Sequence, residues 1–94
     1  MAGYWVVKVR VSDADAYGEY AKLATRAVAA HGGRFLVRGQ PAATKEGADY
    51  PRNVVVEFPS YEQAVACYES PAYKEALAFA KGAAERIFAI VNAD

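Results

Sequence analysis

Residues that crosslink a chain or bind metals are scarce in this sequence, which has one cysteine and one histidine among its 94 residues. The single cysteine, Cys67, has no partner for an internal disulfide, which favours the reducing cytoplasm as the compartment. The single histidine, His31, excludes a metal site built on several histidines, and no glycine lies in a phosphate-binding loop. We therefore expect neither a bound metal nor a cofactor.

An excess of charge and a long apolar run are also missing. Eleven basic and eleven acidic residues cancel at neutral pH, so no net charge attracts nucleic acid or an anionic membrane. No apolar run approaches the roughly 20 residues of a membrane-spanning helix. The N-terminal segment becomes charged at Lys8 and has the pattern of a strand rather than a signal peptide. Neither nucleic acid nor a membrane is expected as a partner.

Apolar residues, by contrast, are abundant. They make up 54% of the chain, and seven tyrosines and one tryptophan add large contact surfaces. A chain of this length forms one domain with a single core, here residues 1–94. A protein this small with so much apolar content often buries part of it against a partner chain.

Hydrophobic periodicity predicts four strands and two helices, the second of them broken in two. Strands are expected at 4–11, 34–39, 52–58 and 86–91, and helices at 12–31, 59–70 and 71–82. Ser60 and Gln63 have the spacing of a capping box, and Ser70 followed by Pro71 predicts a second helix start. The segment at 40–50 is too long for a tight hairpin, which hints at a flap or a partner-contacting arm.

The element order β-α-β-β-α-β predicts an α+β fold, the ferredoxin-like sandwich. In that fold both helices cover one face of a four-stranded antiparallel sheet, and the strands follow the order 4-1-3-2. The other face of the sheet is left bare. A second copy can cover it by packing sheet to sheet, which closes a dimeric α+β barrel, so we expect a homodimer.

Alternation along the strands predicts a mixed character for the bare face. Charged and polar side chains are expected there among valines and a leucine: Lys8, Arg10, Arg34, Arg38, Asn53 and Glu57. One interpretation is cross-strand ion pairing that sets register and the choice of partner. The other is a cavity in which Arg10, Arg34 or Arg38 binds an anionic group and Glu57 orients it or takes a proton.

His31 and three tyrosines are the other candidate site residues. At a helix C-terminus a histidine can bond free carbonyl groups. The helical phase of His31 is nevertheless inward, so it is also a candidate base or ligand-positioning group. Tyr20, Tyr68 and Tyr73 are expected near a pocket between helices and sheet, where alanine-rich helix faces leave room.

Four stretches of the chain together resemble a family of small bacterial proteins. They are "GYWVVKVRVSD", "HGGRFLVRG", "RNVVVEFPSYEQAVACYESPAYKEAL" and "RIFAIV". The family is known only as a domain of unknown function, number thirteen-thirty, within the dimeric α+β-barrel superfamily. The resemblance implies a homodimer packed sheet to sheet, and it makes Arg38 and Glu57 the better site candidates. Because the superfamily includes monooxygenases, isomerases and ligand-binding domains, the fold does not fix the function.

Three functions remain open at this point. The first is a cytoplasmic homodimer that binds a small anionic or carbonyl-bearing organic molecule between sheet and helices. The second is a cofactor-independent monooxygenase or isomerase that uses His31 or Glu57 as its base. The third is a dimer without a ligand, in which the charged sheet face only directs assembly.

Overall fold

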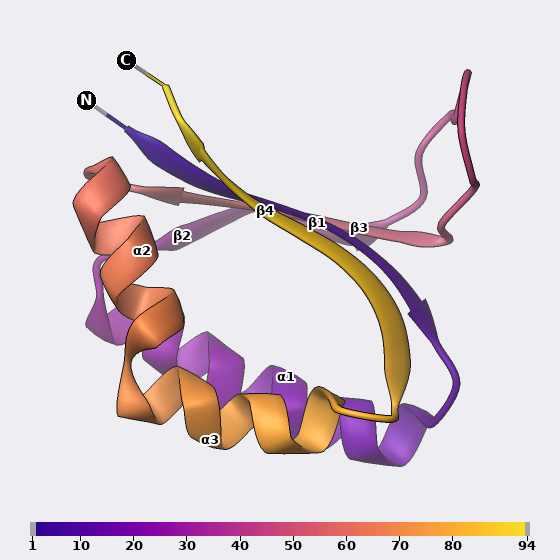
Figure 1. Ribbon diagram of the computed structural model, residues 1–94, viewed down its shortest axis with the longest axis horizontal. Coiled ribbons are helices and arrows are strands. Elements are labelled where there is room, and N and C mark those ends of the chain that lie inside the picture. The colour runs from indigo at the N-terminus through magenta and orange to yellow at the C-terminus, as the bar shows by residue number, and fades with distance from the viewer. Residues whose placement is uncertain (1, 94) are drawn as a thin grey trace.

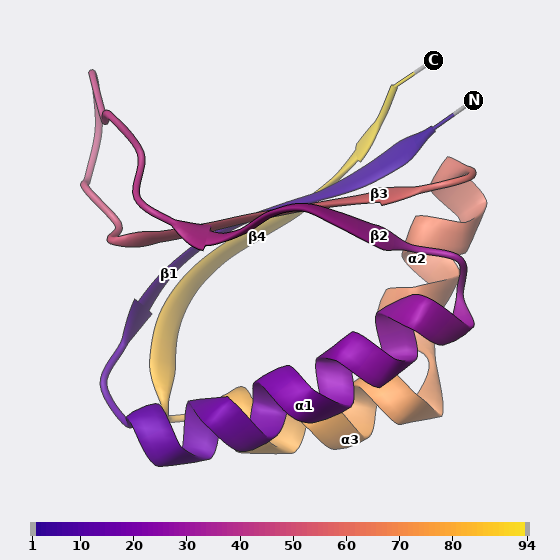
Figure 2. The ribbon, with the colours of Figure 1, turned by 180° about the vertical axis from the view of Figure 1, so that it is seen from behind.

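The computed structural model describes residues 2–93 and has the predicted ferredoxin-like architecture. Its elements in chain order are β1 (Gly3–Val11), α1 (Ala14–Ala30), β2 (Arg34–Gln40), β3 (Arg52–Phe58), α2 (Tyr61–Glu69), α3 (Pro71–Ala80) and β4 (Ala84–Asn92). The four strands form one antiparallel sheet in the order β2-β3-β1-β4. All three helices lie on the same side of this sheet, as Figures 1 and 2 show from opposite directions. The predicted strand order and helix placement are confirmed.

Side-chain caps begin each helix where the sequence predicts it. Asp13 accepts a hydrogen bond from the backbone of Ala16 at the start of α1, and Ser60 accepts one from Gln63 at the start of α2. Ser70 accepts one from Tyr73, with Pro71 in the first turn of α3. Each cap contributes about 1 kcal/mol. The predicted break between the two C-terminal helices is therefore built into the sequence.

The core lies between the sheet and the helices, with the indole of Trp5 at its centre. The Trp5 ring lies 5.1 Å from Phe58, 4.9 Å from Tyr73 and 5.0 Å from Phe88, measured between centroids. Its Nε1 donates a hydrogen bond of 2.9 Å to the carbonyl of Ala64, so the buried indole leaves no polar atom unpaired. Alanines on the inner faces of α1 and α3 leave space for these rings.

A β-bulge in β2 changes which residues face the helices. Arg34 and Phe35 pair with Glu57 and Val56, but after a register shift Val37 pairs with Val55 and Arg38 with Val54. Directly paired residues share a face, and a bulge inserts one extra residue and so reverses the alternation beyond it. The expectation that Arg38 lies on the bare face is therefore wrong. Arg38 points toward the helices.

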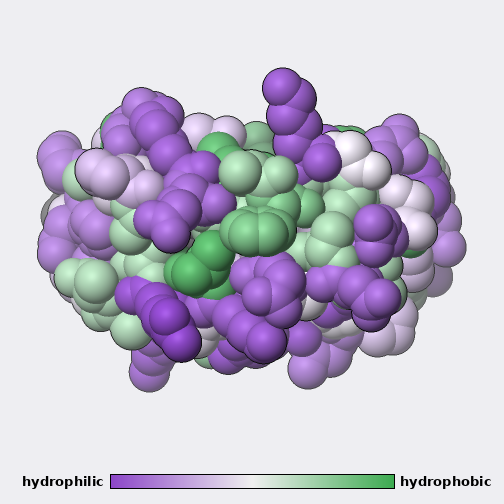
Figure 3. Space-filling model, turned by 90° about the horizontal axis from the view of Figure 1, so that it is seen from below, coloured by the Kyte–Doolittle hydropathy of each residue, from purple (hydrophilic) through white to green (hydrophobic). Residues whose placement is uncertain are grey.

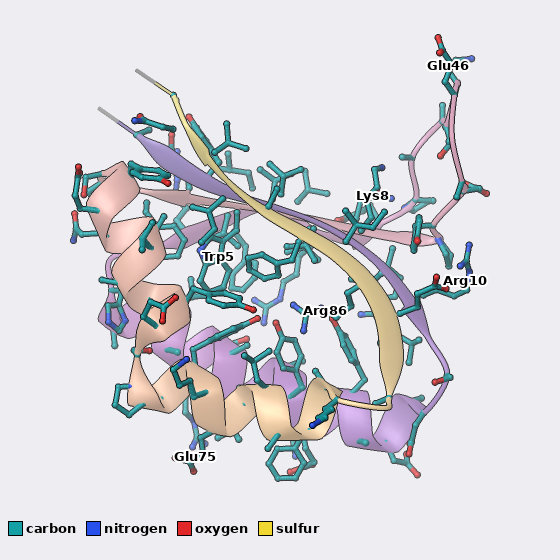
Figure 4. All side chains as sticks on the ribbon, in the orientation of Figure 1. Trp5, Lys8, Arg10, Glu46, Glu75 and Arg86 are labelled. Atoms are coloured by element: carbon teal, nitrogen blue, oxygen red, sulfur yellow. The ribbon has the colours of Figure 1, made fainter. Side chains whose placement is uncertain are left out.

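The two faces of the molecule differ in character. The bare sheet face carries four large apolar side chains that are between 39 and 51% exposed: Val6, Leu36, Ile87 and Val91. The helix side, seen from below in Figure 3, shows apolar side chains along a central band with hydrophilic ones around it. The loop between β2 and β3 projects beyond the sheet and carries Glu46 at its tip (Figures 1 and 4).

Candidate functional site

Three strands each direct one arginine toward the helices. Arg38 belongs to β2, Arg52 to β3 and Arg86 to β4. Arg52 and Arg86 are both paired with Val9 of the intervening strand β1, so they lie in one row across the sheet. Strands are spaced by about 4.8 Å, which places the backbones of these two arginines about 10 Å apart. Arg86 is partly buried, whereas Arg38 and Arg52 are exposed, so only Arg86 places its charge inside the core.

Arg86 lies between the sheet and the helices and meets two tyrosine hydroxyls (Figure 4). Its Nη2 donates to Tyr20 Oη and to Tyr73 Oη, each at 3.1 Å. The two hydroxyl oxygens are 2.7 Å apart and hydrogen-bonded to each other. The guanidinium also lies over the Tyr20 ring, with its Cζ 4.7 Å from the centroid. We call Tyr20, Tyr73 and Arg86 the Arg86 cluster.

The Arg86 cluster has more hydrogen-bond donors than acceptors. Both hydroxyl oxygens accept from Arg86, and only one hydroxyl hydrogen is used in the bond between the tyrosines. The other hydroxyl hydrogen has no acceptor among residues 2–93, and the buried Nε of Arg86 is also unpaired there. A buried donor without a partner costs about 1–3 kcal/mol. The cluster therefore lacks an acceptor, and an oxyanion would supply one.

The charge of the Arg86 cluster is also unbalanced. None of the ion pairs within residues 2–93 includes Arg86, Arg52 or Arg38. Burial raises the pKa of Tyr20 and of Tyr73 above the ordinary tyrosine value. Both hydroxyls are therefore protonated and neutral at physiological pH, and the guanidinium remains charged at any such pH. The cluster carries one uncompensated positive charge.

A hollow of about 80 Å³ lies between α1 and the sheet, and we call it the α1 hollow. Aromatic and aliphatic side chains form most of its lining. Tyr20 is the member of the Arg86 cluster that lines the hollow. Arg38 and Arg52 line it as well. Arg38 Nη2 donates to Thr25 Oγ1 at 2.5 Å, and its Cζ lies 4.3 Å from the centroid of Phe35. These contacts place the Arg38 guanidinium at the rim of the hollow, although the side chain as a whole is exposed.

Arg52 lines the same hollow and packs against a tyrosine ring. Its Cζ lies 5.6 Å from the ring centroid of Tyr17, and the side chain is exposed. Gly39, beside it, has a φ of +92°, and a Cβ there would make ordinary van der Waals contact with the Nε of Arg52 at 3.4 Å. The second register shift of β2 occurs at this glycine. Glycine thus permits the backbone turn that β2 makes here.

A second, more open groove of about 400 Å³ reaches the Arg86 cluster from the other side. It runs between α3 and β4, and we call it the α3 groove. Its lining includes Arg86, Phe88, Tyr68 and the exposed Lys81. The ring of Tyr68 lies 5.2 Å from that of Tyr73. Tyr68 thus lies beside the cluster, as the sequence predicts.

Glu57 lies on the bare sheet face, where its charge is balanced. Arg34 Nη2 contacts Glu57 Oε1 at 2.9 Å, and Tyr4 Oη donates to Glu57 Oε2 at 3.0 Å. The hydrogen bonds from Tyr4 and Arg34 lower the pKa of the Glu57 carboxyl. The bond to Glu57 in turn raises the pKa of Tyr4. We call Tyr4, Arg34 and Glu57 the Glu57 cluster.

His31 terminates α1 and does not reach the Arg86 cluster. Its Nδ1 lies 2.9 Å from the carbonyl oxygen of Ala27, and its backbone N–H donates to the carbonyl oxygen of Val28 in the last turn of the helix. Gly32 follows with a φ of +76°, as expected of a helix-ending glycine. Nearby, burial raises the pKa of Cys67 to about 12, so this thiol is an unreactive part of the core.

The sequence-predicted site residues therefore fall into two groups. Tyr20, Tyr68 and Tyr73 lie together between sheet and helices, and Arg38 lines the adjoining hollow. The remaining three, Arg34, Glu57 and His31, lie elsewhere. Neither a carboxylate nor a histidine lines the α1 hollow within residues 2–93.

Arg86 and Arg52 are the site residues that sequence reasoning missed. The signal for Arg86 was present in the last strand, where Arg86, Phe88 and Ile90 alternate with residues of the bare face. An arginine in phase with buried aromatic and aliphatic residues indicates an inward charge. Arg52 is likewise in phase with Val54, Val56 and Phe58 of β3.

The part of the chain that the structure describes contains neither a cluster of metal-ligating side chains nor a helix that could span a membrane. Residues 2–93 contain no cluster of three or more histidine, cysteine or carboxylate side chains arranged to hold a metal ion. None of the helices in these residues is long and apolar enough to cross a membrane.

Solved structures share this fold at low sequence identity. A protein of unknown function from Rhodopseudomonas palustris is 20% identical, with a TM-score of 0.77 over 97% of this chain and 81% of that one. A dimeric ferredoxin-like protein of unknown function from Jannaschia sp. CCS1 is 14% identical, with a TM-score of 0.74 over 98% and 99%. SnoaB, a cofactor-independent oxygenase from Streptomyces nogalater, is 11% identical, with a TM-score of 0.63 over 98% and 92%.

At these identities the likeness concerns the fold alone. No curated protein matches the chain. The family described as a domain of unknown function, DUF1330, matches residues 2–94, which is nearly the whole sequence. The chain therefore belongs to the DUF1330 family.

Proposed function

We propose that this protein is a cytoplasmic homodimer that binds a small anionic organic molecule between sheet and helices. The anionic group is held by the Arg86 cluster. The observation that carries the proposal is the surplus of donors there: a charged guanidinium with an unpaired Nε, and two tyrosine hydroxyls that share a single hydrogen bond. A carboxylate or enolate oxygen accepts charge-assisted hydrogen bonds from such groups.

The size of the α1 hollow restricts the ligand to a small molecule. Pockets for drug-sized ligands measure about 300–1,000 Å³, whereas this hollow measures about 80 Å³. Its lining is mostly apolar, with aromatic rings from Trp5, Phe35 and Phe88. A small organic acid with an apolar body fits this lining better than a polycyclic compound.

The bare sheet face is the proposed dimer interface. Its exposed apolar side chains, Val6, Leu36, Ile87 and Val91, form surface that pairing with the same face of a second copy would cover. The Jannaschia neighbour is described as dimeric. Because the helices lie on the opposite side, such a dimer leaves both hollows of each protomer uncovered by the partner's sheet.

Native mass spectrometry of protein purified without denaturation tests binding and assembly together. We expect a dimer carrying a reproducible extra mass that is absent from the Arg86→Gln variant. The Arg26→Gln variant is the matched control, because Arg26 is an exposed arginine of α1 outside the cluster. A thermal-shift screen with small carboxylic acids complements the experiment. An empty dimer that no acid stabilises contradicts the binding proposal and leaves assembly as the function.

A second candidate function is that of a cofactor-independent oxygenase or isomerase, favoured by the oxygenase among the structural neighbours. The donors of the Arg86 cluster would stabilise the oxyanion of an enolisable or phenolic substrate. His31 and Glu57 are the candidate bases, although both lie outside the α1 hollow. Oxygen uptake with a panel of phenols tests oxygenase activity. Turnover that His31→Ala or Glu57→Gln abolishes while the dimer persists would establish this function in place of simple binding.

A further inference from the structure

We infer that the ligand of the proposed site is a dianion, an organic acid whose second acidic group is held by Arg38 and Arg52. This inference rests on the proposed function, because it assumes that the first acidic group binds at the Arg86 cluster. It adds the substrate class and two specificity-determining residues. Arg38 and Arg52 both line the α1 hollow, and Tyr20 connects that hollow to the Arg86 cluster.

The positions of the arginines across the sheet suit two separate acidic groups. Arg52 and Arg86 share a row, with Val9 of β1 between them. Their backbones are about 10 Å apart, so the two side chains start from separate positions on the sheet. The rings of Tyr17 and Tyr20 lie between the two guanidiniums: Arg52 packs on Tyr17, Tyr17 on Tyr20 at 4.9 Å, and Tyr20 on Arg86.

Charge balance separates these arginines from others on the same sheet. On the bare face Arg34 pairs with Glu57 at 2.9 Å, and Arg10 pairs with Glu85 at 2.7 Å. On the helix face neither Arg38 nor Arg52 has an ion-pair partner within residues 2–93. Both side chains are exposed, yet Arg38 contacts Thr25 and Phe35, and Arg52 packs against Tyr17 beside Gly39. Two oriented arginines without carboxylates suit a ligand that brings its own.

The surface between the two anchoring points selects the body of the ligand. Val7, Val54 and Phe88 line the α1 hollow, and none of them offers a hydrogen bond from its side chain. A hydrocarbon chain or a small ring between two acidic groups matches that surface. Straight-chain dicarboxylates are therefore suitable probes, because their length can be varied without changing their chemistry.

Calorimetric titration of the full-length protein with dicarboxylates from malonate to adipate tests the inference. Monocarboxylates of the same chain lengths are measured beside them at physiological salt. We expect one dicarboxylate length to bind about tenfold more tightly, or better, than its monocarboxylate, as a second charge-assisted pair implies. The double variant Arg38→Gln/Arg52→Gln is expected to abolish this advantage while monocarboxylate binding persists. Arg86→Gln is expected to weaken both.

Two control variants separate the possible failures. Arg26→Gln removes an exposed charge of α1 and Lys81→Gln removes one at the α3 groove, and both are expected to keep the dicarboxylate advantage. Equal affinities for the two series overturn the dianion inference and leave the proposed function intact. An advantage lost in Lys81→Gln but kept in the double variant also overturns it, because the second group then lies in the α3 groove. Absence of binding by every acid overturns the proposed function together with the inference.

Discussion

Each face of the sheet holds an arginine beside a tyrosine, but among residues 2–93 only the bare face also holds a carboxylate paired with them. In the Glu57 cluster, Arg34 and Tyr4 converge on Glu57, and the carboxylate balances the charge of Arg34. In the Arg86 cluster, one guanidinium meets two tyrosines, and donors exceed acceptors. The same residue types therefore produce a self-sufficient cluster on one face and an incomplete one on the other.

On the proposed function, this difference in charge balance distinguishes a cluster that supports the structure from one that binds a ligand. An exposed and balanced ion pair contributes little free energy, but it can direct register or the choice of partner. A buried and unbalanced guanidinium destabilises the fold unless something compensates its charge. On the proposed function, the Glu57 cluster serves assembly and the Arg86 cluster binds the ligand, and comparing matched variants of the two tests that proposal.

The largest expected difference concerns the tyrosine rings. Tyr73 is fully buried and packs against Trp5, so Tyr73→Ala is expected to lower the free energy of unfolding by about 3–5 kcal/mol. Tyr4 is only half-buried, and Tyr4→Ala is expected to cost about 1 kcal/mol or less. Urea unfolding followed by circular dichroism measures both values. Similar losses in the two variants would contradict the contrast in burial.

A smaller effect of opposite sign is expected from the arginines. Arg86→Met replaces an uncompensated buried charge with an apolar side chain of similar length, which is expected to raise stability by about 1 kcal/mol. The same change at the exposed Arg34 removes an ion pair and is expected to lower stability by about 1 kcal/mol at most. Thermal unfolding without added ligand compares the two. If Arg86→Met melts at a lower temperature than the wild type, the hydrogen bonds and cation–π contacts of Arg86 outweigh the cost of its charge.

The smallest expected effect is a dependence on pH that belongs to the Glu57 cluster alone. Because the pKa of Glu57 is lowered in the folded protein, its ionised form contributes stability above the ordinary value of 4.5. That contribution is lost as the pH falls through the lowered pKa. The stability difference between wild type and Glu57→Gln is therefore expected to shrink between neutral pH and about pH 3.

The Arg86 cluster provides the control for that measurement. Burial raises the pKa of Tyr20 above its ordinary value, so its hydroxyl does not titrate in the acidic range. The stability difference between wild type and Tyr20→Phe is expected to stay constant over the same pH interval. If it also changes with pH, an acidic group outside the assigned cluster acts on Tyr20.

Most of the architecture could be predicted from the sequence because its signals are local. Asp13, Ser60 and Ser70 cap the helices where their spacing predicts, and alternation in β1 and β3 identifies the buried face. Less of the candidate site could be predicted from the sequence. Arg38 was assigned to the wrong face because no glycine or proline in the sequence indicates the bulge between Phe35 and Val37. That bulge reflects pairing with β3, which lies far along the chain.

The sequence by itself determined the order of elements, the strand order they imply and the apolar residues of the core. These follow from periodicity, capping and turn residues, which act over a few neighbouring positions. Only the tertiary structure decided which charges meet. Tyr20, Tyr73 and Arg86 come from three different elements, and a missing acceptor among them becomes visible only when every nearby donor has been placed. Within residues 2–93 a carboxylate balances Arg34 and none balances Arg86, which is a property of packing and not of composition.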